Sequence, residues 1–177
     1  MRSPVSARYD LVARLLHWLI AALVAAQFVI AWVMPDVGRN TQPVGAIAWH
    51  LGVGSALLVA MACRIIWRIS HRPPATELPA TMRIASSLTH GALYALLVIV
   101  PVLGWSNASS RGWQVAAAGV APLPALSATG SRFGHAMGDV HSVLAWVLLG
   151  IVCLHVGAAL LHRFVFRDGV LQRMTLW

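Results

Sequence analysis

Long apolar runs separated by short polar segments dominate the hydrophobic pattern of this chain. Four runs are long enough to cross a bilayer, which takes about 20 helical residues: Leu15–Met34, Val44–Cys63, Ile84–Trp105 and Val140–Leu161. Because no lipid-facing backbone group finds water, each run is expected to be a helix. The pattern predicts a single all-α membrane domain over 1–177, a four-helix bundle with helices at about 12–34, 44–68, 84–106 and 139–165 and an outer loop at 106–139 that covers one end.

Composition supports this fold class and excludes an ordinary soluble domain. Hydrophobic residues make up 59% of the chain and charged residues only 10%, whereas soluble domains carry about 25% charge. The thirteen basic residues are all arginines, against five acids. They lie between the apolar runs rather than on a solvated basic face, so the basic excess indicates a lipid bilayer as partner and not a nucleic acid.

The arginines also predict the orientation of the bundle. Ten of them fall on the side that holds both termini and the second connection, and three fall on the other side, namely Arg39, Arg111 and Arg132. The ten are Arg2, Arg8, Arg14, Arg64, Arg68, Arg72, Arg83, Arg163, Arg167 and Arg173. By the positive-inside rule both termini are cytoplasmic.

Histidines inside the runs are candidate functional residues, because ionisable groups in a membrane are costly. His17 and His155 belong to the inner halves of the first and fourth runs, while His50 and His141 lie near the outer ends of the second and fourth. The four histidines therefore form two pairs, and the two members of each pair lie at a similar depth in the membrane. A single intramembrane histidine can instead bond a carbonyl group or line a proton path, and that alternative stays open for each.

The fourth run carries two of these histidines, and their spacing indicates how they are oriented. His141 and His155 are 14 residues apart, which is roughly 21 Å of helical rise and about 40° short of whole turns. They therefore project from one face at two depths, as two stacked cofactors in a bundle would require. Opposed imidazoles without thiolate or carboxylate fit six-coordinate haem better than zinc or a di-iron centre. No Cys-x-x-Cys-His motif for covalent haem attachment is present, and we expect Cys63 and Cys153 to be small buried apolar residues.

Motifs in all four runs resemble those of the bacterial cytochrome b561 family, in particular its small di-haem members that act as superoxide:ubiquinone oxidoreductases. The matching residues, in chain order, are Leu16-His17-Trp18, Trp49-His50-Leu51-Gly52, Arg64 to Arg68, His90-Gly91-Ala92-Leu93-Tyr94, Pro101, Gly104, His141, Leu154-His155 and His162. Their order and spacing together are more specific than any one motif.

The resemblance implies two haem b groups, the inner one on His17 and His155 and the outer one on His50 and His141. It also implies a ubiquinone contact at His162, for which the alternative is a snorkelling interfacial residue. It implies a supporting role for His90 at a haem edge or propionate, for which the alternative is plain helix packing. Propionates need neutralisation, which arginine provides with a bidentate fork. The candidates are Arg14, Arg64 and Arg68 at the inner side and Arg132 at the outer side. Each is also explicable as a topology or lipid-headgroup charge.

The sequence is compatible with three functions. The first, implied by the resemblance, is oxidation of superoxide at the outer face of a bacterial inner membrane with reduction of ubiquinone. The second is an electron-transfer anchor for a redox partner protein, such as a dehydrogenase, hydrogenase or soluble cytochrome. The third is a haem-free histidine-lined transporter or structural bundle. Five acids, mostly in loops, do not form a hydrolase site.

Overall fold

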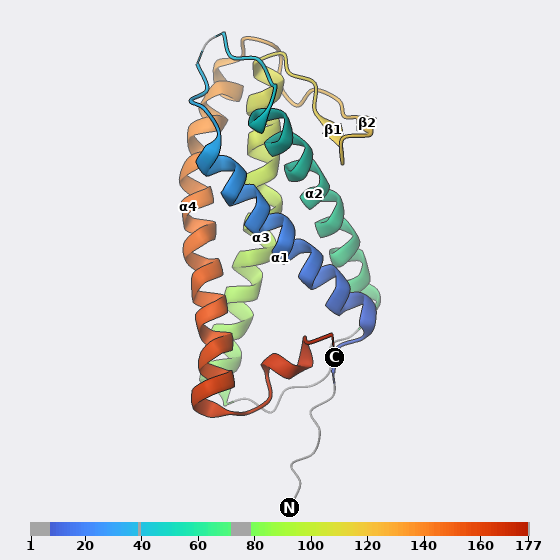
Figure 1. Ribbon diagram of the computed structural model, residues 1–177, viewed down its shortest axis with the longest axis vertical. Coiled ribbons are helices and arrows are strands. Elements are labelled where there is room, and N and C mark those ends of the chain that lie inside the picture. The colour runs from blue at the N-terminus through green and yellow to red at the C-terminus, as the bar shows by residue number, and fades with distance from the viewer. Residues whose placement is uncertain (1–7, 39, 72–78, 177) are drawn as a thin grey trace, which may run out of the picture.

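Four long helices build the computed structural model, which describes residues 8–38, 40–71 and 79–176. They are α1 (Leu11–Val33), α2 (Ala46–Ser70), α3 (Ala80–Ser110) and α4 (Arg132–Leu161). All four are long and apolar enough to cross a membrane. Figure 1 shows them as one elongated bundle in which successive helices run in opposite directions. The predicted fold class, a four-helix membrane bundle, is confirmed.

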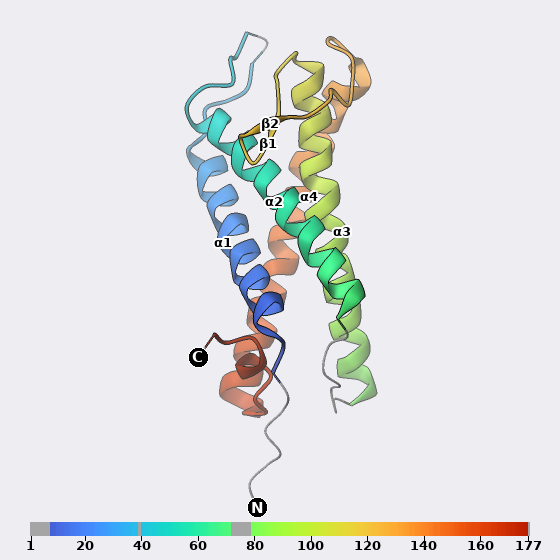
Figure 2. The same ribbon diagram turned by 90° about the vertical axis from the view of Figure 1, so that its right-hand side faces the viewer.

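The helices associate as two antiparallel pairs, α1 with α2 and α3 with α4, which pack across each other (Figures 1 and 2). Each pair consists of helices that follow one another in the chain, joined by residues 34–45 and 111–131. The first and last described residues lie toward one end, which we call the inner end, and the opposite end is the outer end.

Two helices extend beyond the predicted spans at the outer end. Helix α3 continues to Ser110, and α4 begins at Arg132 rather than near 139. Ser131 caps α4 by accepting a hydrogen bond from the Gly134 amide, and Ser109 Oγ accepts one from the Leu126 amide. Such capping and loop contacts extend a helix past the bilayer, where hydropathy carries no signal.

The outer connection folds over the bundle as a small hairpin. Strands β1 (Ala116–Ala117) and β2 (Ala121–Pro122) pair antiparallel and lie beside the outer part of α2 (Figure 2). Ser55 of α2 secures the hairpin, because its hydroxyl donates to the Ala116 carbonyl at 2.7 Å and accepts from the Ala118 amide at 3.1 Å.

At the inner end the chain turns back and docks on α1 (Figure 1). A π-helical turn, η1 (His162–Phe166), follows α4, and a 3-10 turn, η2 (Leu171–Arg173), comes next. The Arg14 guanidinium donates to the Thr175 carbonyl, and the Trp18 indole donates to the Met174 carbonyl, each at 2.8 Å. The C-terminal segment therefore covers part of the inner end.

The buried core lies midway along the bundle. It contains Leu148, halfway along α4 between His141 and His155, and residues of the other three helices, namely Ile20, Val24, Leu57, Ala60, Met61 and Leu97. A packed apolar layer therefore separates the outer end of the bundle from the inner end.

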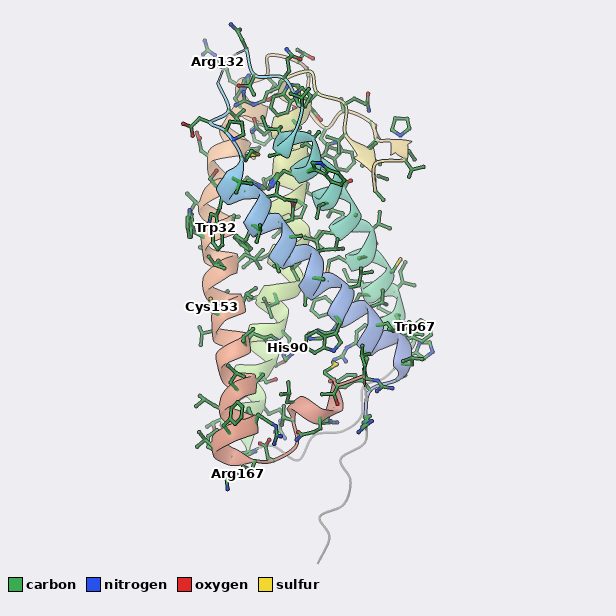
Figure 3. The ribbon with its side chains drawn as sticks, viewed as in Figure 1. Trp32, Trp67, His90, Arg132, Cys153 and Arg167 are labelled. Carbon is green, nitrogen blue, oxygen red and sulfur yellow. The ribbon has the colours of Figure 1, made fainter. Side chains whose placement is uncertain are left out.

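The expectation of buried cysteines was wrong, because Cys63 and Cys153 are both exposed on the bundle surface (Cys153 is labelled in Figure 3). In a membrane span an apolar side chain meets hydrocarbon on the outside of the protein, so burial within the bundle gains little. Among the arginines of the orientation argument, Arg2, Arg39 and Arg72 lie outside the described residues.

Candidate functional site

The outer end of the bundle brings two histidines face to face. His50 of α2 and His141 of α4 have ring centres 6.0 Å apart and ring planes at 81°. The Nδ1–H of His141 donates to the Val100 carbonyl of α3 at 2.8 Å, which leaves its Nε2 free. A Cβ at Gly104 would lie 3.0 Å from His141 Nδ1. The imidazole can therefore pack against α3 here only because residue 104 has no side chain.

A cavity opens beside this outer pair. Its walls come from α1, α2, α3, α4 and the outer hairpin region, with His50 and His141 among the lining residues; the others are Gln27, Leu51, Gly54, Ser55, Leu58, Pro101, Gly104, Trp105, Val115 and Leu123. The outer connection supplies Val115 and Leu123 and so forms part of the cavity wall. Apolar walls with a few polar groups are typical of a cofactor or ligand site.

The inner end brings together three histidines from three helices. His17 of α1 and His155 of α4 have ring centres 6.2 Å apart. The ring of His90, from α3, lies 5.2 Å from that of His155, and Figure 3 shows it in the lower half of the bundle. The Nδ1–H of His90 donates to the Ser86 carbonyl at 2.6 Å. The inner site therefore has a third imidazole beside the pair matched by depth.

Both pairs have the separation that a shared six-coordinate metal requires. Two imidazoles on opposite sides of one ion, each with a metal–nitrogen distance of about 2 Å, hold their ring centres roughly 6 Å apart. Within the described residues, no group of three or more His, Cys, Asp or Glu side chains is placed to hold a metal ion by itself. The donor set and spacing fit axial ligation of haem; the ligand assignment itself stays a prediction.

Arginines gather at the inner end more than at the outer one. Arg64 donates through Nε to the Tyr94 hydroxyl at 3.0 Å and through Nη1 to the Ala13 carbonyl at 3.1 Å. Arg64 and the exposed Arg68 line a cavity between the inner ends of α1 and α2, whose lining residues do not include His17 or His155. Arg132 is exposed at the far outer end (Figure 3), nine residues and about 13 Å of helix before His141.

Arg14 and Asp10 connect α1 to its neighbours at the inner end. Arg14 Nε is buried without a hydrogen-bond partner, although its Nη1 reaches the C-terminal segment. Asp10 caps α1 and accepts a hydrogen bond from the Trp67 indole at 3.0 Å. Burial raises the pKa of this carboxyl, but the hydrogen bonds from the Ala13 amide and Trp67 outweigh it and hold the pKa below its ordinary value.

His162 stands at the junction of α4 and the returning C-terminal segment. Its Nδ1 meets Asp168 Oδ2 at 2.5 Å, and its ring lies 5.3 Å from that of Phe166. Arg167 between them adopts the left-handed conformation at φ 53°, which turns Asp168 back toward the imidazole. His162 is therefore a partnered side chain rather than a free interfacial one.

Two polar residues of these sites were missed by reasoning from the sequence. Asp168 has no signal of its own, because its approach to His162 depends on the turn at Arg167. Gln27 has one: it is a polar amide inside the first apolar run, and such residues face the bundle interior by default. In the structure Gln27 Nε2 donates to the His50 carbonyl at 3.1 Å.

Three known proteins are similar to this chain over most of its length. The chain is 28% identical over 171 residues to Cytochrome b561 homolog 2 of Escherichia coli, covering 94% of this chain and 90% of that protein. It is 29% identical over 165 residues to the probable superoxide oxidase CybB of Yersinia pestis, covering 90% of each. It is also 29% identical over 164 residues to Cytochrome b562 of Cereibacter sphaeroides, covering 90% of this chain and 89% of that protein.

The family comparison extends over nearly the whole chain, because the model of the prokaryotic cytochrome b561 family matches residues 8–177. That range contains all four helices and both histidine pairs. The family implies b-type haem, oxidoreductase chemistry and electron transport in a membrane. The chain belongs to the prokaryotic cytochrome b561 family and is a membrane electron-transfer cytochrome b.

Proposed function

We propose that this protein oxidises superoxide at the outer face of a bacterial inner membrane and reduces ubiquinone, with both termini on the cytoplasmic side. The observation that carries the proposal is that one bundle holds two pairs of facing imidazoles, one pair toward each end. The name of the relative from Yersinia pestis supports the choice of superoxide. The arginine excess at the inner end supports the orientation.

His50 and His141 would hold one haem b, and His17 and His155 would hold a second. When bound, these groups supply one-electron transfer between the two membrane faces. The chain orients the ligands: the Val100 carbonyl holds the His141 ring so that Nε2 points away from α3, as outer-shell partners commonly do for metal-binding histidines. At the inner site, Arg64, Arg68 and Arg14 supply the positive charge that propionates require.

Ubiquinone reduction consumes protons as well as electrons, and His162 is our candidate to supply one. Because Asp168 binds its Nδ1, the opposite nitrogen, Nε2, is the atom available to a quinone carbonyl. The carboxylate would also stabilise the imidazolium form before transfer. A positioned general acid accelerates such steps by about 10²–10⁴-fold.

Replacing His162 with alanine is therefore expected to slow reoxidation of the reduced protein by ubiquinone by about 10²-fold, with haem content unchanged. Asp168→Asn is expected to slow it less, because the imidazole remains. Stopped-flow absorbance of the reduced haem bands after mixing with a soluble ubiquinone measures both rates. His71→Ala is the matched control, since His71 is another inner-end histidine, stacked on Trp67. Reoxidation of His162→Ala at the wild-type rate would contradict the role.

One observation favours a second function, the electron-transfer anchor for a partner protein. The sequence places Arg39, Arg111 and Arg132 on the outer side against Asp36 and Asp139, which leaves only a small positive excess. Arg111 is also engaged by Asn107 and the Gly38 carbonyl. Such a face steers an anion such as superoxide only weakly. A redox partner protein, rather than superoxide, would then deliver the electrons.

The two functions are separated by a steady-state assay on the purified holoprotein. A superoxide-generating enzyme is added together with a soluble ubiquinone, and formation of ubiquinol is followed in the presence and absence of superoxide dismutase. The proposed function predicts ubiquinol formation that depends on this protein and is suppressed by the dismutase. A holoprotein that contains haem but produces no ubiquinol would favour the anchor function.

A further inference from the structure

The outer cavity contains two buried polar atoms without partners, and they belong to neighbouring side chains. Within the described residues, His50 Nδ1 and Gln27 Oε1 are both buried and make no hydrogen bond. His50 Nδ1 can donate a hydrogen bond, whereas Gln27 Oε1 can only accept one. Leaving either unpaired away from water costs free energy, and both residues line the same cavity.

The amide of Gln27 is held at residue 50 by specific features of the fold. Its Nε2 donates to the His50 main-chain carbonyl at 3.1 Å. Gly54, one helical turn after His50, provides the space, because a Cβ there would lie 2.6 Å from Gln27 Nε2. Gln27 is thus a polar side chain of a transmembrane helix that is anchored beside a candidate ligand.

The two histidines of the outer pair differ in their support. His141 has a fixed partner for Nδ1, the Val100 carbonyl, whereas His50 has none. Metal-binding histidines almost always donate the N–H of their second nitrogen to an oxygen acceptor, which selects the tautomer and orients the ring. If His50 binds iron through Nε2, an acceptor for its Nδ1–H is required.

We propose that Gln27 is this acceptor: in the loaded outer site its Oε1 takes the Nδ1–H of His50 while its Nε2 stays on the His50 carbonyl. The proposal rests on the proposed function in that it requires a metal between His50 and His141. Gln27 acts through His50 and is a positioning residue. A hydrogen bond to Nδ1 makes the imidazole a stronger donor, which favours ferric over ferrous iron and lowers the reduction potential.

The test is a spectroelectrochemical titration of the purified holoprotein and two variants, with the inner haem as the reference within the same molecule. Gln27→Met keeps the length of the side chain and removes the acceptor. Gln27→Glu keeps an acceptor and adds charge. We expect the outer potential to rise in Gln27→Met and fall in Gln27→Glu, while the inner potential stays at its wild-type value.

The rise in Gln27→Met is the decisive result, because the added charge alone explains a fall in Gln27→Glu but no rise in the neutral variant. An outer potential unchanged in Gln27→Met overturns the proposal. If Gln27→Met loses the outer haem, retention in Gln27→Glu supports the proposal, and loss in both variants overturns it in favour of a packing role. A wild-type protein without an outer haem shows instead that the proposed function fails, and this is seen before any variant is made.

Discussion

Replacing His155 with alanine is expected to reduce the haem content of the purified protein from two groups per chain to one. His155 and His17 are the inner pair, with ring centres 6.2 Å apart. With no covalent attachment motif in the chain, a haem b is retained chiefly through its axial ligands and the packing around it. The outer pair lies beyond the apolar layer at Leu148 and should be unaffected. A pyridine haemochrome assay with protein quantification measures the loss.

His90→Ala is the matched control, because His90 is the third imidazole of the inner site, 5.2 Å from His155. Its Nδ1–H donates to the Ser86 carbonyl of its own helix. This contact is consistent with a residue that packs beside the haem and does not bind the iron. We expect this variant to keep both haems. The opposite pattern, two haems in His155→Ala and one in His90→Ala, would show that the pairing by depth chose the wrong histidine.

Replacing His50 with alanine is expected to remove the outer haem and, with it, superoxide-driven reduction of ubiquinone. Electrons that enter at the outer end must otherwise cross the full separation between the pairs, roughly 21 Å along α4. Ubiquinol formation should fall to the level of a protein-free control. The inner haem should remain reducible by dithionite, which a reduced-minus-oxidised spectrum records.

His135→Ala serves as the control for this variant, since His135 is an exposed histidine in the first turns of α4. It should behave as the wild type. Superoxide-driven ubiquinol formation that persists in His50→Ala would mean that electrons enter the protein without the outer pair, and the proposed path would then be wrong.

The four helices could be predicted from hydropathy because the bilayer leaves few alternatives to a continuous apolar helix. Their ends could not. Helix α3 continues through Ser106 and Ser109, and α4 begins at Arg132, where small and polar residues follow the local contacts of the outer loop. Hydropathy records only the part of a helix that needs an apolar environment.

The proximity of the histidines was predictable for a related reason. Helical rise converts sequence distance into depth, so antiparallel helices that span one bilayer bring residues of equal depth to the same level. The structure brings His50 near His141 and His17 near His155. Haem binding by each pair stays a prediction, because equal depth shows only that the two imidazoles lie close together.

Contacts that depend on the path of the chain outside the helices could not be predicted. The Asp168 contact to His162 requires a left-handed turn at Arg167. The docking of Met174 on Trp18 requires the C-terminal segment to fold back beneath the bundle. No periodic pattern reports such turns, because each depends on a few backbone angles rather than on a repeated environment.

The measurement that tests the central claim most directly is a stopped-flow spectrum of the purified holoprotein mixed with superoxide, followed by a second mixing with ubiquinone. The account predicts rapid appearance of reduced b-type bands with superoxide and their discharge by ubiquinone. Haem bands that superoxide leaves oxidised would contradict the proposed substrate and favour a partner protein as donor. A protein that binds no haem would contradict the assignment of both histidine pairs.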